Sequence, residues 1–311
     1  MTTVRLRSVA KINLDLRVLE RRADGYHNLR TVFQTISLAD TLDIAYAPAR
    51  RLTVELQSTV EITGNLIEKA AQLLAIPGRF NIRLHKRIPM GGGLGGGSSN
   101  AAAMLLAIPF LVGKQVPLRK LIDLASQLGS DVPFFLLGGT AAGLDRGTEL
   151  YPLPDIPRLP AVVITPKIHV STAEAYRAID EHRSGAPPAP TSHEALTWML
   201  ETAPPAAWPC CNDFETVVFP QFPQLKSIQG KLQKLGAGVA LMSGSGSTLF
   251  GLFANRKSRD SAVVSLRKDL GKEVIFPVSL VSRGAYRSLW RRQLRVSPDL
   301  TIWPPQSRYA Q

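Results

Sequence analysis

A glycine cluster between residues 89 and 100 has the clearest chemical potential in this chain. It reads Pro89-Met90-Gly91-Gly92-Gly93-Leu94-Gly95-Gly96-Gly97-Ser98-Ser99-Asn100, with six glycines in seven positions. Without Cβ atoms to keep a ligand away, the backbone amides of such a loop can converge on an anion. A helix beginning at Ser98 would add its own N-terminal amides and the positive end of its dipole. A triphosphate is the natural occupant, and Ser98 and Ser99 can add hydroxyl donors or a magnesium ligand.

Three interpretations of this loop compete. A Walker loop requires Gly-Lys-Ser/Thr at its end, but Gly97 is followed directly by Ser98. A dinucleotide fold would accept Gly91, Gly93 and Gly96 as G-x-G-x-x-G, but it also needs an acidic residue about 20 residues later, where the chain reads Val-Pro-Leu. A flexible linker would lack ordered elements on both sides, whereas a strand pattern precedes this loop and a helix pattern follows it. A phosphate-binding loop of another class is therefore favoured.

An N-terminal strand places two polar side chains on one face. In Ala10-Lys11-Ile12-Asn13-Leu14, Lys11 and Asn13 point to the side opposite Ile12 and Leu14. A buried lysine is costly unless it meets negative charge, so this segment alone is better explained by a solvated strand face. The segment 22–27 follows, reading R-A-D-G-Y-H. Its Asp-Gly pair predicts a turn but does not explain the Tyr-His that comes next.

A single aspartate lies where a helix pattern ends, in Gly129-Ser130-Asp131-Val132-Pro133. Such an aspartate can simply accept hydrogen bonds from turn amides. It can also take the proton of an alcohol and orient its oxygen toward the γ-phosphate of a nucleotide. If Lys11 lay near Asp131, it would keep the carboxylate ionised and stabilise developing negative charge.

These segments together resemble one family of small-molecule kinases. The motifs P-x-G-G-G-L-G-G-G-S-S-N, A-K-I-N-L, R-A-D-G-Y-H and G-x-D-V-P are similar to those of the 4-diphosphocytidyl-2-C-methyl-D-erythritol kinases. That family belongs to the superfamily of galactokinase, homoserine kinase and mevalonate kinase, the GHMP kinases. Further matches are V-S-T-A-x-x-Y at 170–176, N-D-x-E at 212–215 and M-S-G-S-G-S-T at 242–248. The resemblance covers roughly residues 5–282.

The resemblance implies roles for the matched residues. Lys11 and Asp131 are the expected catalytic pair, with Asp131 as the base. The expected ATP-binding residues are Asn65, Pro89, Met90, Gly91, Gly92, Gly93, Leu94, Gly95, Gly96, Gly97, Ser98 and Ser99, with Ser99 also as a magnesium ligand. The expected acceptor-binding residues are Asn13, Tyr26, His27, Phe33, Tyr176, Ser243 and Gly244. His27 would contact a cytosine, and the rings of Phe33 and Tyr176 would stack on its two faces. The 212–215 segment is expected to cap a helix.

The reaction implied by the resemblance is ATP-dependent phosphorylation of the 2-hydroxyl of 4-diphosphocytidyl-2-C-methyl-D-erythritol, a step of the non-mevalonate route to isoprenoids. Magnesium would arrive as the nucleotide complex, and the partners would be small molecules, with no nucleic acid. Two alternatives remain open at this point. A different kinase of the superfamily would keep the glycine loop without the cytosine site. A nucleic-acid-binding protein could combine a similar fold with the basic C-terminal segment.

The elements that must position these residues predict an α+β protein of two domains. In the first half, period-two patterns predict strands within 4–46, 80–88 and 134–143, and helices follow Asn65, Ser98 and residue 117. Four prolines within 152–160 then predict a linker. In the second half, capping boxes begin at Ser171 and Thr191, with a loop at 185–190 between them. Helices are expected at 225–235 and 263–270. Strands are expected at 239–242, 248–253 and 273–277.

The resemblance implies a ribosomal-protein-S5-like N-terminal domain over 1–151 and a ferredoxin-like C-terminal domain over 160–283. A basic tail, 284–311, lies outside the shared motifs, and we expect it to fold back on the body.

The chain has 311 residues, 45% of them hydrophobic, and a formal net charge of +13, which suits polyanionic partners. Cys210 and Cys211 are adjacent, which predicts reduced thiols. With no apolar signal segment and no apolar run of about 18 residues, a cytoplasmic location is expected, while oligomeric state is left open.

Overall fold

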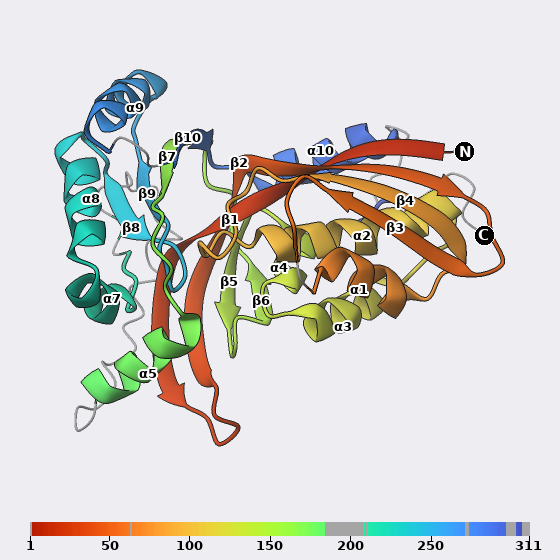
Figure 1. The fold of residues 1–311 in the computed structure, drawn as a ribbon, viewed down its shortest axis with the longest axis horizontal. Helices are drawn as coiled ribbons and strands as arrows, with labels where there is room; N and C mark the ends of the chain where they lie inside the picture. Colours follow the sequence, from red (N-terminus) through yellow and green to blue (C-terminus); the bar gives the residue numbers. More distant parts are fainter. Residues whose placement is uncertain are drawn as a thin grey trace.

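The computed structural model describes residues 2–62, 64–183, 208, 210–270, 274–296 and 303–306. Its two lobes each combine a β-sheet with helices, as predicted for an α+β chain of two domains (Figure 1). The loop expected at 185–190 and the capping box expected at Thr191 lie outside the described residues.

One long antiparallel hairpin runs through both lobes. It consists of β1 (Thr2–Arg21) and β2 (His27–Ala47), which pair along almost their whole length. The predicted Asp24-Gly25 turn connects them, and Gly25 has a φ of +84°, which favours glycine. Residues 8–16 are buried without interruption, because this part of β1 passes between the lobes rather than over a surface.

The N-terminal lobe has a six-stranded sheet with helices on one face (Figure 1). Its other strands are β3 (Leu52–Ser58), β4 (Gly78–His85), β5 (Thr140–Leu144) and β6 (Glu149–Pro152), in the order β3-β4-β2-β5-β6 with β1 paired to β2. The helices are α1 (Leu66–Leu74), α2 (Gly96–Val112), α3 (Leu118–Leu128) and α4 (Val132–Leu137). Helix α2 carries an alanine-rich segment that is buried almost all round, so it forms the centre of this core.

The strand predicted over 134–143 is wrong in its first half, where helix α4 forms instead. Pro133 sits in the first turn of α4, where its fixed φ and missing N–H fit a helix start. Gly138 and Gly139, with φ of +68° and +74°, end the helix, and β5 begins only at Thr140. A short apolar run buried in a core gives no period that separates helix from strand, which explains the error.

The C-terminal lobe has a four-stranded antiparallel sheet in the order β10-β7-β9-β8. Its strands are β7 (Pro160–Thr165), β8 (Val239–Met242), β9 (Leu249–Leu252) and β10 (Val274–Ser279). Its helices are α5 (Thr172–His182), α7 (Glu215–Gln221), α8 (Pro223–Lys234) and α9 (Arg256–Leu270). With α8 and α9 as its two helical connections, the lobe follows the β-α-β-β-α-β order of a ferredoxin-like domain.

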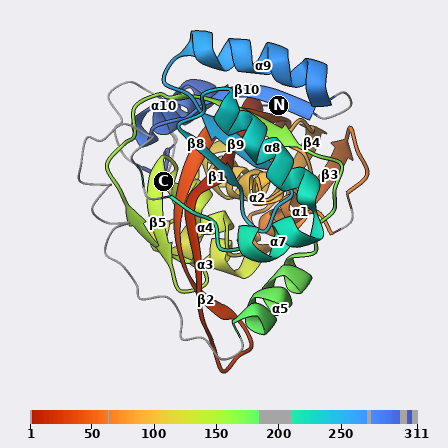
Figure 2. The ribbon, with the colours of Figure 1, turned by 90° about the vertical axis from the view of Figure 1, so that its left-hand side faces the viewer.

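A shared apolar cluster joins the two lobes. Ile12 and Leu14 of β1 are fully buried against the C-terminal sheet, where Leu241 and Phe250 belong to the same cluster. Figure 2 shows the hairpin lying alongside β8 and β9. Lys11, the catalytic candidate on β1, is therefore held at the junction of the lobes.

The C-terminal segment folds back on the N-terminal lobe. Helix α10 (Arg283–Leu294) contributes Tyr286, Trp290 and Leu294 to the N-terminal core, each at most 3% exposed. The part of the expected tail that the structure describes thus packs on the body. Over the described ranges, no helix is both long and apolar enough to cross a bilayer.

Candidate active site

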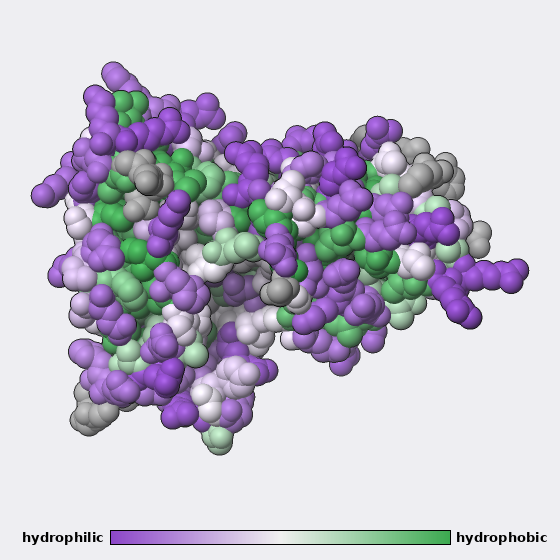
Figure 3. Space-filling view, viewed as in Figure 1, coloured by the Kyte–Doolittle hydropathy of each residue, from purple (hydrophilic) through white to green (hydrophobic). Residues whose placement is uncertain are grey.

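Two cavities meet at the glycine loop, between the lobes. The loop cavity, about 340 Å³, lies between residues 89–98, Asn65 and Lys86. The hairpin cavity, about 690 Å³, lies between the β1–β2 hairpin, α5, Asp131 and the 243–247 turn. Gly93 lines both, so the two cavities adjoin at the glycine loop. Figure 3 shows the notch between the two lobes, bordered by hydrophilic residues.

The glycine loop presents a curved row of backbone amides. Gly91, Gly93 and Gly95 have φ of +71°, +75° and +66°, alternating with residues of ordinary φ. Such alternation turns successive N–H groups toward one concave side, which suits an anion. Helix α2 starts at Gly96 without a side-chain cap, and no described residue accepts from the first-turn amides of Gly96 and Gly97. The loop and the helix start therefore form one site for phosphate groups.

The glycines of this loop serve two different purposes. A Cβ on Gly93 would overlap the carbonyl oxygen of Ser243, and one on Gly92 would overlap the Thr248 hydroxyl. Both glycines are therefore needed for contact with the C-terminal lobe. In contrast, Gly91 has open space at its Cβ position, and Gly97 has only Leu66 near it, at 3.9 Å. Only these two fit the sequence argument that glycine leaves room for a ligand.

Asn65 lines the loop cavity, and its Oδ1 also accepts from the amide of Ile67, 3.0 Å away, so it caps α1 as predicted. Pro89, Met90 and every residue of 91–98 line the same cavity. Ser99 does not line it. Its side chain is buried, at 3% exposure, so the structure does not bring the proposed magnesium ligand to the cavity.

Lys86 is a lining residue that the sequence analysis missed. Its Nζ donates to Asp40 Oδ2 at 2.7 Å and to the carbonyl oxygen of Ile88 at 2.6 Å. The buried carboxylate of Asp40 also accepts from the amides of Arg87 and Ile88. The pair thus fixes the segment that leads into the glycine loop, with a positive charge beside the cavity. A lysine three residues before Pro89 was the available sequence signal.

The expected catalytic pair is brought together. Lys11 Nζ lies 3.3 Å from Asp131 Oδ2 and donates to Asn13 Oδ1 at 2.7 Å. Asp131 is the N-cap residue of α4, yet its side chain caps no helix amide, so it is free to face the cavity. The backbone amide of Lys11 donates to Leu94 in the glycine loop at 3.0 Å. The pair therefore lies directly beside the phosphate-binding loop.

Six of the seven expected acceptor-binding residues line the hairpin cavity: Asn13, Tyr26, His27, Phe33, Tyr176 and Gly244. Ser243 does not line it and is fully buried. Its hydroxyl donates to the carbonyl oxygen of Gly93 at 3.1 Å and accepts from the amide of Asn13 at 3.4 Å. Ser243 thus joins the two lobes behind the cavity.

Aromatic rings occupy one end of the hairpin cavity. His27 and Tyr176 stack with ring centroids 5.0 Å apart and an interplanar angle of 15°, and His27 Nε2 lies 2.6 Å from Asp180 Oδ1. Phe33 packs against Phe134 instead, at 5.0 Å. Burial, with a smaller contribution from the charge of Asp131, raises the pKa of Tyr176 to about 12, so its hydroxyl stays protonated.

Cations surround this cavity although its sequence motifs contain few. Arg21, Arg146 and Arg177 all line it, and the guanidinium of Arg146 lies 5.0 Å from the centre of the Tyr26 ring. Arg146 follows β5 in a short connection, where nothing in the local sequence indicates a ligand site. These charges suit an acceptor that is itself an anion.

Comparison with known proteins agrees with this geometry. Residues 65–139 match the GHMP kinases N terminal domain, and residues 194–272 match GHMP kinases C terminal. The 4-diphosphocytidyl-2-C-methyl-D-erythritol kinase of Solibacter usitatus is 50% identical, with 99% of each chain covered. A crystal structure of 4-(cytidine 5'-diphospho)-2C-methyl-D-erythritol kinase superposes with a TM-score of 0.75 at 38% identity, covering 89% of this chain and 98% of the other.

The fold extends to more distant kinases. A homoserine kinase structure from Cytophaga hutchinsonii has a TM-score of 0.63 at 18% identity, covering 92% of this chain and 96% of the other. This likeness shows the common fold alone. The expected two-domain GHMP kinase fold is thus confirmed. With the family motifs matched in both lobes and half of all residues shared with a full-length relative, the chain belongs to the 4-diphosphocytidyl-2-C-methyl-D-erythritol kinase family of GHMP kinases.

Proposed function

We propose that the protein transfers the γ-phosphoryl group of ATP to the 2-hydroxyl of 4-diphosphocytidyl-2-C-methyl-D-erythritol, in the non-mevalonate route to isoprenoid precursors. One observation carries the proposal. The ammonium of Lys11 lies 3.3 Å from Asp131, and the backbone of Lys11 is hydrogen-bonded to the glycine loop. The proposal is supported because a carboxylate and an ammonium lie together beside the loop that would bind the nucleotide.

The donor nucleotide fits the loop cavity. Amides of the glycine loop and of the α2 start would bind its phosphate oxygens, and Lys86 adds positive charge at the edge. Asn65 and Met90 line the same cavity and would contact the rest of the nucleotide. The terminal phosphate would lie at the Gly93 side of the loop, where the hydrogen bond from the Lys11 amide to Leu94 brings the Lys11–Asp131 pair next to it.

The chemistry follows from the pair. Asp131 takes the proton of the 2-hydroxyl while the oxygen of that hydroxyl forms a bond to the γ-phosphorus. The bond between the γ-phosphorus and the β–γ bridging oxygen breaks, and ADP leaves. Lys11, only 4% exposed and 3.3 Å from Asp131, stabilises negative charge on the oxygens in transfer. Asn13 accepts from Lys11 Nζ and so orients the ammonium.

The acceptor fits the hairpin cavity. Its cytosine would lie at the aromatic end, where His27 and Tyr176 would contact the base, and Phe33 lines the same cavity. The arginines of the cavity, Arg146 among them, would bind its diphosphate. Gly244 would lie beside the sugar-like end, next to Asn13.

Magnesium is proposed to enter with ATP. Over the described ranges, no three His, Cys, Asp or Glu side chains converge on a point where they could hold a metal ion. Bound to the nucleotide, the ion would neutralise charge on the phosphates. Of the two serines at the α2 start, Ser98 lines the loop cavity and fits such a complex better than the buried Ser99. We place the reaction in the cytoplasm, with these small molecules as the partners.

The direct test is ADP release by the purified chain supplied with ATP, magnesium and the cytidine-linked acceptor. We expect turnover that depends on this acceptor, with phosphorus NMR placing the new phosphate on the 2-hydroxyl. Homoserine and mevalonate serve as matched alcohol acceptors without cytidine, and neither should support turnover. Equal activity with one of these alcohols, or none with the cytidine-linked acceptor, would contradict the proposal.

A further inference from the structure

The N-D-F-E segment at residues 212–215 has no role in the chemistry above, yet it contacts every part of the C-terminal lobe that borders the site. Before α7 the chain runs beside β1 like an added strand, with hydrogen bonds from Leu16 to Cys211 at 2.8 Å and from Asp213 to Leu16 at 3.0 Å. The expected capping role is present in one contact, because Asn212 Oδ1 accepts from the amide of Phe214, the N-cap residue of α7, at 3.0 Å. What else the segment does follows from its side chains.

Asn212 holds the 243–247 turn. Its buried amide nitrogen donates to the carbonyl oxygens of Met242 and Gly244, at 2.7 and 2.8 Å. Its Oδ1 accepts from the amide of Phe214 at 3.0 Å, so the amide group has a fixed orientation. Gly244 lines the hairpin cavity, and Ser243, between the two carbonyl groups, binds the glycine loop. One side chain thus fixes the turn where the two cavities meet.

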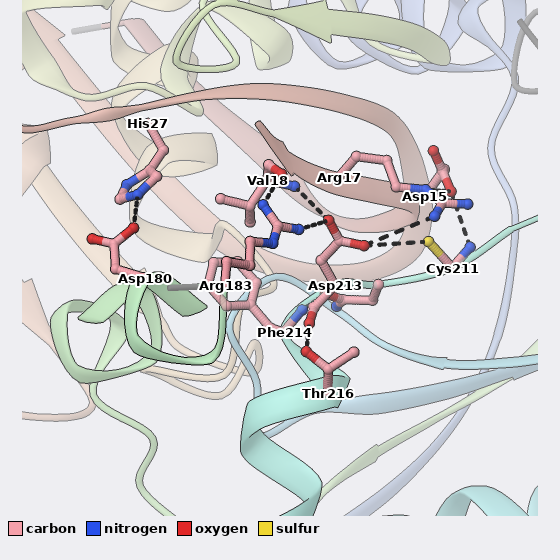
Figure 4. Close-up of polar contacts among 11 residues, drawn as sticks. Asp15, Arg17, Val18, His27, Asp180, Arg183, Cys211, Asp213, Phe214 and Thr216 are labelled. Atoms are coloured by element: carbon pink, nitrogen blue, oxygen red, sulfur yellow. Dashed lines mark hydrogen bonds and ion pairs between the residues drawn. The ribbon is translucent and has the colours of Figure 1, made fainter. Parts of the chain in front are cut away.

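Asp213 holds α5 against β1 (Figure 4). Its Oδ2 accepts from the amide of Val18 at 2.9 Å and from Arg183 at 2.7 Å, and Arg183 in turn donates to the carbonyl oxygen of Val18 at 2.5 Å. Arg183 ends α5, the helix that carries Tyr176 and faces His27 through Asp180. The base-binding end of the hairpin cavity therefore depends on a second contact made by this segment.

The other two side chains act on the same two structures. The ring of Phe214 meets Tyr176 edge-on, with centroids 4.9 Å apart, and so supports the aromatic end. Glu215 accepts from the amide of Met242 at 2.7 Å and from Gln229 at 2.9 Å, so it holds the strand that leads into the turn. Of the four residues, the first and the last thus bind the turn and the strand leading into it. The middle two bind the α5 side.

We propose that residues 212–215 are a positioning element that sets the 243–247 turn and helix α5 independently, one for phosphoryl transfer and the other for binding of the cytidine end. The inference rests on the proposed function for the meaning of the two sites. Asn212 and Glu215 act through the turn and Asp213 acts through α5, whereas Phe214 both supports Tyr176 of α5 and lines the hairpin cavity itself. A helix-capping or purely stabilising segment would not separate the two effects.

The test compares two isosteric variants by steady-state kinetics. Asp213→Asn removes the charge that Arg183 binds, so the acceptor KM should rise about tenfold while the ATP KM changes by less than about twofold. Asn212→Asp places a carboxylate against two carbonyl oxygens, so kcat should fall about tenfold or more. Thr216→Ala is the matched control, because its hydroxyl donates only to the backbone of Asp213 and reaches neither structure. It should keep wild-type constants.

Hydrogen–deuterium exchange separates this inference from the proposed reaction, because it needs neither substrate. Exchange should rise in α5 for Asp213→Asn and in the 243–247 turn for Asn212→Asp, each without the other. If Asp213→Asn does not fold, Arg183→Gln removes the same contact from the other side. Exchange or KM changes that spread equally over both structures, or that are absent in both variants, would overturn the inference. A wild-type protein that fails to use the cytidine-linked acceptor would overturn the proposed function alone.

Discussion

Nζ of Lys11 lies 3.3 Å from Oδ2 of Asp131, joining the middle of β1 to the N-cap residue of α4. Hydrogen bonds to the backbone fix both partners. The Lys11 amide donates to the carbonyl oxygen of Leu94, and the carbonyl oxygen of Leu136 at the other end of α4 accepts from Trp303. The ammonium is almost fully buried, whereas the Asp131 side chain remains 31% exposed to the cavity. The carboxylate can therefore reach a substrate while its charge partner stays in place.

This arrangement predicts a selective defect for Asp131→Asn. An amide has nearly the same shape but cannot take the hydroxyl proton, so turnover should fall by about 10²–10⁴ while the ATP KM stays nearly unchanged. Asp123→Asn is the control, since it makes the same change on an exposed position of α3. Initial-rate measurements over both substrates decide the matter, and full activity of Asp131→Asn would exclude this residue as the base.

The two groups of glycines predict opposite behaviour for two alanine variants. Gly93→Ala must move the Ser243 carbonyl and adopt a φ of +75°, so its Tm should fall and both KM values should rise. Gly97→Ala lies in helix α2 with space around its Cβ, so its Tm should stay at or above wild type. Because Gly97 is exposed to the loop cavity, its ATP KM should still rise. Equal Tm losses in the two variants would contradict this division.

The sequence predicted the local parts of this site better than the relations between them. The glycine loop, the strand of Lys11 and the turn at Asp24-Gly25 each have a local pattern, and the structure places them as expected. The distance from Lys11 to Asp131 depends on how α4 packs, and no spacing along the chain encodes it. Only the family resemblance predicted that they would be close.

Other features were missed because their meaning arises from packing. Lys86 reads as the end of an alternating strand, and its role at the loop cavity depends on the buried carboxylate of Asp40. The apolar run of α4 was interpreted as a strand because burial on all sides removes periodicity. The 212–215 segment looked like a helix cap, whereas its side chains reach residues from three separate parts of the chain.

Tyr176 gives a test of the aromatic end of the hairpin cavity. Tyr176→Leu removes the ring that stacks on His27 and should raise the acceptor KM about tenfold, since stacking on a base contributes ~1–3 kcal/mol. Tyr176→Phe keeps the ring and should retain near-wild-type constants. In both variants the ATP KM should be unchanged. A loss of activity that followed the hydroxyl instead of the ring would rule out stacking as the function of this residue.

The C-terminal segment should stabilise the lobe that carries Asp131. Helix α4 has six residues, and two of its last carbonyl oxygens accept hydrogen bonds from the C-terminal segment. The carbonyl oxygen of Phe135 accepts from the Tyr286 hydroxyl, and that of Leu136 accepts from Trp303 Nε1 at 2.8 Å. Tyr286→Phe leaves a buried carbonyl without this donor and should lower the free energy of unfolding by ~1–3 kcal/mol.

Tyr151→Phe is the matched control for Tyr286→Phe, because this exposed hydroxyl meets only Glu149. Denaturant unfolding of both variants measures the difference. If the two lost the same stability, the tail would not support α4 through this hydrogen bond.

Glu215 should make stability depend on pH in an unusual direction. Burial raises the pKa of its carboxyl group to about 7, against an ordinary value of 4.5, although hydrogen bonds from Met242 and Gln229 oppose the shift. Between these two values the folded protein holds a proton that the unfolded chain has released. The contribution of Glu215 to stability is therefore complete below about pH 4.5 and is lost as the pH rises to about 7.

Glu215→Gln removes this titration while keeping an oxygen that can accept from Met242. The free energy of unfolding of the wild type, minus that of the variant, should thus decrease by about 3 kcal/mol as the pH rises from 4.5 to 7, and then stay level. Urea unfolding of both proteins at several pH values in this window measures the difference. Parallel curves would mean that Glu215 titrates normally in the folded state, and its two hydrogen bonds would then have to stabilise the buried carboxylate by as much as burial destabilises it.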